Sequence, residues 1–404
     1  MRHILIVNHN AGSVHHGPNF RSYYVARSLL EHGFRVTIVC SGFSHKLTKL
    51  PVIEGESHVE DVDGVRMIWL KMPVYRSSVQ RLWNYAQFAM RLRRLDAIVP
   101  EPVDAVVCSS PPPYWIWACR HFTQQREIPL IFECRDLWPD VILETRRTAI
   151  LNPAVWLMML AERIAYRSAD AVVAVNQEAR KTMERRGLAK GKFHAIPNGV
   201  SLEADNAHES LSSSIRERLP SDDVFRVGYA GSLSRVYGLE YLLGAARLLC
   251  GQRVHFVLAG SGGDEQWLRE QATGLDNVTF VGWIPKPQLH AFLSVVDVAY
   301  AGLLDIPSFA IGSDSTKVFE YLKAARPVVH ALGAENSVIA EAGAGLHVPP
   351  ENSEAIAKAV VKMRDLTQDK RDALGRAGLD YLKQYRTYEA LGFQWKELLD
   401  SWGN

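Results

Sequence analysis

The feature that most constrains this 404-residue chain is a regular alternation of short apolar runs with amphipathic stretches, beginning at the third residue. Residues 3–7 (HILIV) predict a buried strand, residues 19–32 a helix ended by Gly33, and residues 35–40 (RVTIVC) a second strand. Apolar strands that alternate with helices are typical of a parallel sheet covered on both faces. We therefore expect an α/β, doubly wound fold.

This alternation occurs twice along the chain. It continues to about residue 198, gives way to the polar stretch 204–222, and restarts at residues 225–231 (FRVGYAG). Two tandem Rossmann-like domains are predicted, the first over residues 1–203 and the second over residues 222–384. Because ligands of such domains bind outside the carboxyl ends of the strands, the crevice at those ends is the expected site.

Composition excludes several classes of protein. A formal net charge of +2, with 47% apolar and 22% charged residues, argues against a disordered chain or a strongly basic nucleic-acid binder. The charge is uneven, because residues 1–200 hold 26 Lys and Arg against 18 Asp and Glu, which makes this half a candidate to face an anionic partner.

Cysteine usage and hydropathy indicate the compartment. Five dispersed cysteines without a Cys-x-x-Cys pair predict reduced thiols and no zinc site. The apolar run at the start is too short for a secretory signal, and no run reaches the ~18 residues of a membrane span. A cytoplasmic protein is expected.

The second domain carries a glycine-rich loop, residues 228–238, that follows its first strand and leads into a helix. Free N–H groups at such a helix start attract phosphate oxygens. The candidates here are Gly231, Ser232 and Arg235, whose guanidinium would add a charge-assisted contact. A tight turn that binds nothing is the plainer alternative for one such loop.

A second candidate segment is the polar loop 312–316, which leads into a helix stopped by Pro327. Lys317, Glu320 and Tyr321 are three and four residues apart and share one helical face. A lysine there suits a diphosphate, and the carboxylate can accept hydrogen bonds from ribose hydroxyls. The plainer alternative is a surface ion pair between Lys317 and Glu320.

The first domain offers two loops at strand ends. His16 and Gly17 follow the first strand, and Arg135, Asp136 and Trp138 follow the strand PLIFEC. An aromatic face beside charged donors and acceptors makes a plausible platform for a sugar. In the alternative, Arg135 pairs with Asp136 and Trp138 fills a gap in the core.

Other leads are weaker. The Asp61-Val62-Asp63 sequence suits a metal, but Asp63-Gly64 between extended runs predicts a hairpin turn, so no metal is assigned. No Gly-x-Gly-x-x-Gly follows the first strand, which argues against a nicotinamide dehydrogenase. Residues 75–95 form an amphipathic, Arg-rich helix that either covers the sheet, as is commoner, or lies on an anionic membrane.

Several motifs in combination resemble a known family. They are Ile-Pro-Asn-Gly-Val (196–200), Gly-Tyr-Ala-Gly-Ser-Leu (228–233), and Lys317-x-x-Glu320-Tyr321 followed by Arg-Pro-Val (326–328). The chain resembles, over nearly its whole length, family 4 of the retaining glycosyltransferases of GT-B fold. Residues 16–19 (HGPN), 109–113 (SSPPP) and 135–139 (RDLWP) resemble its bacterial branch that builds surface polysaccharides such as O-antigen and capsule, including N-acetyl-fucosamine transferases.

This resemblance implies a UDP-sugar donor held mainly by the second domain and a saccharide or polyprenol-linked acceptor held by the first. It implies transfer with anomeric retention and a last helix (385–404) that crosses back to the first domain. We expect no metal or other cofactor and no nucleic-acid partner. The catalytic candidates are Lys317, Glu320, Arg235 and Asp136. The donor-binding candidates are Gly231, Ser232, Gly260, Gly282, Trp283, Ile284, Ser315, Thr316 and Tyr321. The acceptor-binding candidates are His16, Gly17, Arg135 and Trp138.

The chain departs from the family pattern at four positions. Gly312 stands where the family has the first of two glutamates, Ser232 and Tyr237 replace the usual Arg and Lys, and Ala325 replaces a glycine. Two rival functions therefore stay open. One is a sugar-nucleotide 2-epimerase of the same architecture, and the other is a non-catalytic subunit that binds a nucleotide or glycan.

Overall fold

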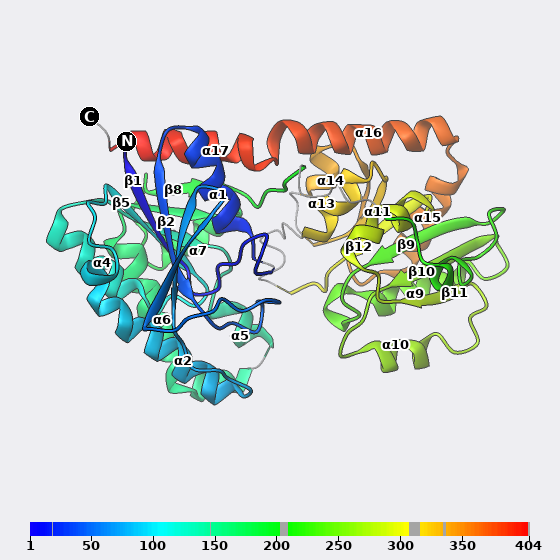
Figure 1. Cartoon of the computed structure of the whole chain (residues 1–404). Helices are drawn as coiled ribbons and strands as arrows, with labels where there is room; N and C mark the ends of the chain where they lie inside the picture. The colour runs from blue at the N-terminus through cyan, green and yellow to red at the C-terminus, as the bar shows by residue number, and fades with distance from the viewer. Residues whose placement is uncertain (18, 146, 203–208, 307–315, 334–336, 403–404) are drawn as a thin grey trace. The chain divides into compact units, whose positions relative to one another are not determined.

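Apolar parallel strands form the centre of two units of the chain (Figure 1). The computed structural model describes residues 1–404 apart from residues 18, 146, 203–208, 307–315, 334–336 and 403–404. Unit 1 consists of Met1–Gly199 and Tyr388–Asn404, and unit 2 of Val200–Thr387. The predicted α/β fold with two doubly wound domains is confirmed.

In unit 1 the strands lie in the order β3-β4-β2-β1-β5-β6-β7-β8, with the β3–β4 pair antiparallel and the other pairs parallel. β1 is buried along its whole length, as its uninterrupted apolar sequence predicts. The elements are β1 (His3–Val7), α1 (Arg21–Glu31), β2 (Arg35–Ser41), β3 (Ser57–Val62), β4 (Val65–Leu70), α2 (Ser78–Arg91), η1 (Leu92–Arg94), α3 (Leu95–Ile98), β5 (Ala105–Ser110), α4 (Ile116–Arg126), β6 (Leu130–Cys134), α5 (Asp140–Thr145), η2 (Arg147–Leu151), α6 (Pro153–Ser168), β7 (Ala171–Ala174), α7 (Ala179–Arg185), β8 (Phe193–Ala195) and α17 (Tyr388–Asp400).

In unit 2 the order is β11-β10-β9-β12-β13-β14, with parallel pairs. The elements are α8 (Ser213–Arg216), β9 (Phe225–Ala230), η4 (Arg235–Tyr237), α9 (Leu239–Leu248), β10 (Val254–Ala259), α10 (Glu265–Gln271), β11 (Val278–Gly282), α11 (Lys286–Ser294), β12 (Val298–Gly302), α13 (Thr316–Lys323), β13 (Val328–Ala331), α14 (Val338–Glu341), β14 (Gly345–Val348), α15 (Ser353–Asp365) and α16 (Gln368–Tyr385).

In each sheet there is one switch point, at which the order in which successive strands are added reverses. In unit 1 the switch lies between β1 and β5, and in unit 2 between β9 and β12. Loops that leave the carboxyl ends of these strands diverge, which opens room for a ligand. The candidate residues after β1, β6 and β9 therefore lie at or next to the expected positions.

The last helix belongs to unit 1. α17 packs on α1 in Figure 1, and its Leu391 and Trp395 are buried in the same apolar core as Tyr23 and Leu29 of α1. Gly392 makes this close packing possible, because a Cβ there would lie 1.8 Å from the Ser28 Oγ. The predicted return of the final helix to the first domain is confirmed.

Other local predictions can be compared with the structure. Asp63 and Gly64 form the turn of the β3–β4 hairpin, both with positive φ. The polar stretch expected to connect the domains is packed from residue 209 onward, because Leu211 and Ile215 are buried in the core of unit 2. Helix α2 buries Tyr85 and Phe88, so the face of the helix that carries them packs against the rest of unit 1.

Candidate functional site

Two glycines at neighbouring strand ends shape the candidate donor site of unit 2. Gly231 follows β9 and Gly260 follows β10, and a Cβ on Gly260 would lie 1.8 Å from the Gly231 carbonyl oxygen. The Gly231 N–H donates to the Ala259 carbonyl at 3.0 Å. Only glycine at residue 260 permits this close approach of the two strand ends.

Lys317, in the first turn of α13, reaches over this glycine loop. A Cβ on Gly231 would lie 2.7 Å from the Lys317 Cε. The Lys317 ammonium donates to the Tyr229 hydroxyl at 2.8 Å and lies 3.4 Å from the centre of the Tyr237 ring. Burial lowers the pKa of Lys317 to about 7. The ring faces attract a cation but carry no net charge, and no described residue forms an ion pair with Lys317, so its protonated ammonium could pair with an anion placed here.

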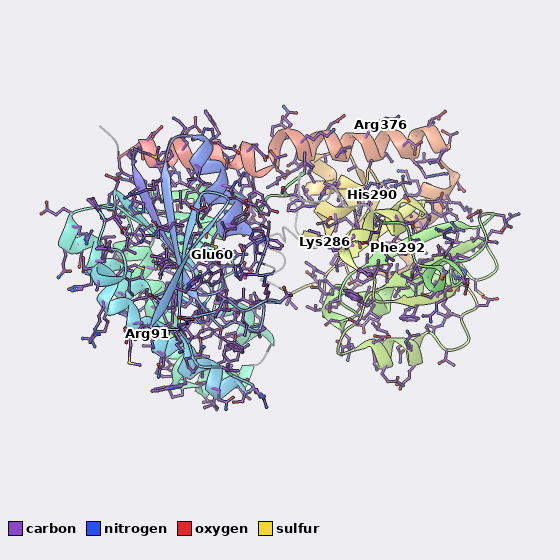
Figure 2. The ribbon with its side chains drawn as sticks, in the orientation of Figure 1. Glu60, Arg91, Lys286, His290, Phe292 and Arg376 are labelled. Carbon is purple, nitrogen blue, oxygen red and sulfur yellow. The ribbon has the colours of Figure 1, made fainter. Side chains whose placement is uncertain are left out.

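Glu320 lies one turn further along α13. Its carboxylate oxygens are 3.9 Å from the Lys286 and the Lys323 ammonium nitrogens (Figure 2 labels Lys286). Burial raises its pKa, and the Lys286 charge opposes this shift. Among the described ion pairs, none joins Lys317 to Glu320, so the plainer alternative of a Lys317–Glu320 surface pair does not hold.

Two further predicted residues of the donor site have structural partners. Tyr321 is buried, and its hydroxyl accepts from the Ala230 N–H at 2.9 Å, which fixes the end of β9 against α13. Arg235 is exposed, stacks on the Trp267 ring at 4.3 Å and lies 3.4 Å from the Glu240 carboxylate. Arg235 thus has an aromatic partner and a carboxylate partner in this structure.

The remaining donor-binding candidates have fewer side-chain partners than Lys317, Glu320 and Tyr321 in the described structure. Ser232 is exposed and its carbonyl accepts from the Tyr229 hydroxyl at 2.7 Å. Gly282 ends β11 with a φ of 87°, and the next residue, Trp283, is 66% exposed. Ile284 is half-buried against the unit 2 core. Ser315 and Gly312 lie outside the described residues, and Thr316 is described only as the first residue of α13.

In unit 1 a polar network joins the carboxyl ends of several strands. The Asn10 side chain donates to the Pro111 carbonyl at 3.2 Å and accepts from the Ser44 hydroxyl at 3.2 Å. Asn19 donates to the Asn10 carbonyl and accepts from the Arg135 guanidinium. Loops after β1, β2, β5 and β6 thereby share one hydrogen-bonded cluster at the switch point of the sheet.

A buried ion pair between Arg21 and Glu133 lies next to this cluster. Glu133, in the otherwise apolar β6, accepts from the Arg21 Nε at 2.8 Å and from the Ser109 hydroxyl at 2.6 Å. Burial disfavours the carboxylate, but the Arg21 and Arg135 charges and the hydrogen bonds outweigh it and lower the Glu133 pKa. Glu133 therefore stays ionised and has a structural role.

Cations collect around this network. Burial lowers the pKa of the Lys46 ammonium, and the charges of Arg135 and Arg81 lower it further. The Arg135 Nε is buried and finds no partner among the described residues. Asp136 is exposed beside them, and no described ion pair joins it to Arg135, so the expected alternative of an Arg135–Asp136 pair is not observed. Asp136 acts in the opposite direction on the Lys46 pKa, but the cations Lys46, Arg81 and Arg135 outnumber this exposed carboxylate, and such a set suits an anionic group.

The other predicted acceptor residues lie at different depths. Trp138 is half-buried in the loop after β6. His16 is buried, with its ring 4.6 Å from the Trp69 ring and its Nε2 3.4 Å from the Glu60 carboxylate, which Figure 2 labels. Gly17 lets the loop after β2 come close, because a Cβ on Gly17 would lie 2.7 Å from the Thr48 nitrogen.

Sequence reasoning missed several residues that surround the candidates. Tyr229 and Asn10 carry no local signal, because their roles come from contacts with distant segments. His330, buried at the end of β13 and hydrogen-bonded to Ser337 at 2.8 Å, was missed too; burial lowers its pKa to about 3, so it stays neutral near Lys317. Glu133 could have been found, since a charge inside an apolar strand is a signal.

In the described part of the chain, no group of three or more His, Cys, Asp or Glu side chains is placed to bind a metal ion. None of the described helices is both long and apolar enough to span a bilayer.

Known protein families match both units. Residues 16–199 match a glycosyl transferase 4-like domain, and residues 224–365 match the glycosyl transferases group 1. Each unit thus contains a domain that matches a glycosyltransferase family. Together the two domains give the chain the GT-B architecture predicted from the sequence.

Relatives of these domains are known by sequence and by structure. The chain is 30% identical over 213 residues to alpha-D-kanosaminyltransferase of Streptomyces kanamyceticus, covering 51% of this chain and 54% of that protein. It thus spans about half the length of this curated relative.

Solved GT-B structures cover nearly all of the chain. Sucrose-phosphate synthase of Thermosynechococcus elongatus superposes with a TM-score of 0.71 at 17% identity over 99% of both chains. HepE of Anabaena, solved in complex with UDP-glucose, superposes with a TM-score of 0.66 at 17% identity over 99% of this chain and 100% of that one. At these identities the likeness establishes the fold.

Proposed function

We propose that this GT-B chain is a retaining glycosyltransferase that moves a sugar from a UDP-sugar to an acceptor hydroxyl in the synthesis of a bacterial surface polysaccharide. The observation that carries the proposal is the Lys317 ammonium, buried at the strand ends of the group 1 domain with tyrosine partners at 2.8 and 3.4 Å. The kanosaminyltransferase relative and the HepE complex with UDP-glucose support it. The proposed sugar is an N-acetylated hexosamine or a deoxyhexosamine.

In this proposal unit 2 binds the donor. Lys317 contacts the diphosphate and stabilises the negative charge that develops on the leaving phosphate as the glycosidic bond breaks. Glu320 accepts hydrogen bonds from the ribose hydroxyls, and Arg235 is a second cation for the diphosphate. The positive charge comes from side chains, and we propose no metal or other cofactor. The departing phosphate oxygen takes the proton of the acceptor hydroxyl.

Unit 1 binds the acceptor. Asp136 orients the acceptor hydroxyl, and the half-buried Trp138 provides a face for a sugar ring. The cations Lys46, Arg81 and Arg135 favour an acceptor that carries a phosphate or diphosphate, as a sugar phosphate or a polyprenol-linked saccharide does. We propose a cytoplasmic enzyme, consistent with such an intracellular donor.

A transfer assay tests this function. Enzyme, acceptor and each of a panel of UDP-sugars are combined, and UDP release and the anomer of the product are measured. Lys317→Ala should lower kcat/KM by about 100-fold or more, the usual loss of one preorganised donor to a developing charge. Lys358→Ala removes an exposed lysine of α15 and should leave the rate unchanged. Equal rates in the two variants would refute the donor site.

The same assay separates the rival functions. Conversion of the UDP-sugar to its epimer without any acceptor would identify a 2-epimerase. Donor binding without turnover of any acceptor tested would identify a binding subunit.

A further inference from the structure

Exposed apolar side chains of unit 1 are concentrated at the start of helix α6. Trp156, Leu157 and Leu160 of this helix are 64, 49 and 50% exposed, and Leu151, just before the helix, is exposed as well. Single exposed apolar residues are ordinary on a protein surface, but a contiguous group marks an interaction surface.

The same face of α6 becomes basic one turn later. Trp156, Leu160, Arg163 and Arg167 follow one another at steps of four, three and four residues and therefore lie on one side of the helix. Arg163 and Arg167 are exposed, and no described residue forms an ion pair with Arg163. Glu162, which is the acid of α6, is buried and lines a cavity beside this face. The exposed face of α6 thus carries apolar and cationic side chains only.

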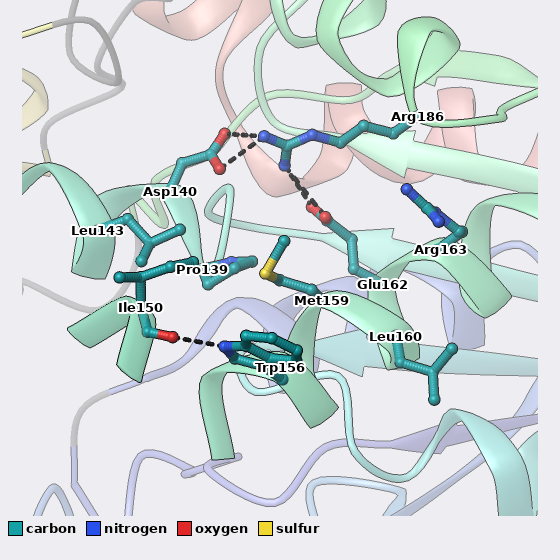
Figure 3. Close-up of a pocket in the computed structure, with 10 residues that line it drawn as sticks. All are labelled: Pro139, Asp140, Leu143, Ile150, Trp156, Met159, Leu160, Glu162, Arg163 and Arg186. Atoms are coloured by element: carbon teal, nitrogen blue, oxygen red, sulfur yellow. Dashed lines mark hydrogen bonds and ion pairs between the residues drawn. The ribbon is translucent and has the colours of Figure 1, made fainter. Parts of the chain in front are cut away.

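A cavity of about 390 Å³ opens beside this face (Figure 3). Its apolar lining comes from α5, η2 and α6 and consists of Leu143, Ile150, Trp156, Met159 and Leu160. The cavity is also lined by Pro139, Asp140, Glu162, Arg163 and Arg186. Figure 3 shows the Arg186 guanidinium between Asp140 and Glu162, with hydrogen bonds of 2.6 and 3.0 Å to their carboxylates. Because these charges bind one another, the cavity presents mainly apolar surface to an incoming group.

We propose that unit 1 docks on an anionic lipid bilayer through the α6 face, defined as Leu151, Trp156, Leu157, Leu160, Arg163 and Arg167. The aromatic and aliphatic side chains enter the boundary between headgroups and acyl chains, where tryptophan is favoured. The two arginines contact lipid phosphates, and the cavity receives a segment of an acyl chain. This places the membrane contact on the exposed side of α6, which borders the cavity, and not on residues 75–95.

The chain offers a closely matched control. The exposed side of α2 carries Val79, Trp83 and Met90, which are 77, 55 and 49% exposed. One tryptophan and two aliphatic residues can therefore be replaced on either helix without disturbing the core. The test variant is Trp156→Glu/Leu157→Glu/Leu160→Glu, and the control is Val79→Glu/Trp83→Glu/Met90→Glu.

The experiment is sedimentation of the full chain with vesicles of phosphatidylglycerol and phosphatidylethanolamine, without donor or acceptor. The wild-type chain should bind, the α6 variant should show at least tenfold weaker partitioning, and the α2 variant should stay within about twofold of wild type. Arg163→Ala/Arg167→Ala should reduce binding and its sensitivity to salt. Thermal stabilisation by UDP, measured on each variant, reports the donor site separately, so failure of docking and failure of the proposed function are distinguishable.

Three results would overturn the proposal. The first is absence of vesicle binding by the wild-type chain, and the second is equal loss of binding in the α6 and α2 variants. The third is a dimer in sedimentation equilibrium that the α6 variant alone abolishes while vesicle binding is absent, which would assign the α6 face to a second copy of the chain.

Discussion

Lys317 changes its charge within the physiological pH range, because burial lowers its pKa to about 7. Below pH 7 the ammonium lies against the Tyr237 ring and can receive an anion; above pH 7 it is mostly neutral. In the proposed function, the donor diphosphate would stabilise the protonated form and raise this pKa. Donor binding above pH 7 would then be coupled to the uptake of one proton.

Donor affinity should consequently fall as the pH rises above 7, by up to about tenfold per pH unit. Titration calorimetry with a UDP-sugar between pH 6 and 9, in buffers of different ionisation enthalpy, measures both the affinity and the proton uptake. Lys317→Arg keeps its charge at every pH and should flatten the profile. The same slope in wild type and in Lys317→Arg would assign the pH dependence to another group.

For single residues, the sequence predicts local placement but not contacts with distant segments. The spacing of Lys317 and Glu320 correctly placed both on α13, because helical periodicity is local. Their partners were not predictable, since Tyr229 comes from β9 and Lys286 from α11, far away in the sequence. Likewise Arg135 was identified, but its hydrogen bond to Asn19 depends on the assembled sheet.

At the scale of secondary-structure elements, the close approach of the ends of β9 and β10 shapes the proposed donor site. Gly260→Ala would place a Cβ 1.8 Å from the Gly231 carbonyl oxygen and must displace the loop over which Lys317 lies. We expect a loss of about 1–3 kcal/mol in the free energy of unfolding, together with weaker donor binding. Urea denaturation and calorimetry measure the two effects.

Gly263→Ala is the control, because nothing lies within 4 Å of a Cβ there. It should leave stability and binding nearly unchanged. A Gly260→Ala chain that matched this control in both measurements would show that the close strand approach is not needed.

Most elements were predictable because their apolar runs are long and continuous. β1 was predicted over residues 3–7, as observed, and the final helix, predicted over residues 385–404, is observed as α17 from Tyr388 to Asp400. The stretch 204–222 was predicted as a polar connection because Leu211 and Ile215 are isolated among polar residues. Their burial in unit 2 depends on a surface that forms only in the folded chain.

On the scale of the whole molecule, unit 1 is assembled from both ends of the chain. Trp395 of α17 is 1% exposed and lies in the core of unit 1, whereas Phe393 of the same helix is 52% exposed. Trp395→Ala should lower the free energy of unfolding of unit 1 by about 3–5 kcal/mol, and Phe393→Ala should change it little. Amide hydrogen exchange in α1 reports this loss, and equal exchange in both variants would mean that α17 does not stabilise unit 1.

The central claim is that this chain binds a sugar nucleotide through Lys317 at the strand ends of unit 2. The most direct test is thermal unfolding of the wild-type and Lys317→Ala chains with a panel of nucleotides and UDP-sugars. Saturation at 100 times the dissociation constant should add about 2.7 kcal/mol of stability to the wild-type chain with UDP and a subset of UDP-sugars, and much less to Lys317→Ala. Absence of stabilisation by every nucleotide, or equal stabilisation of both chains, would contradict the claim.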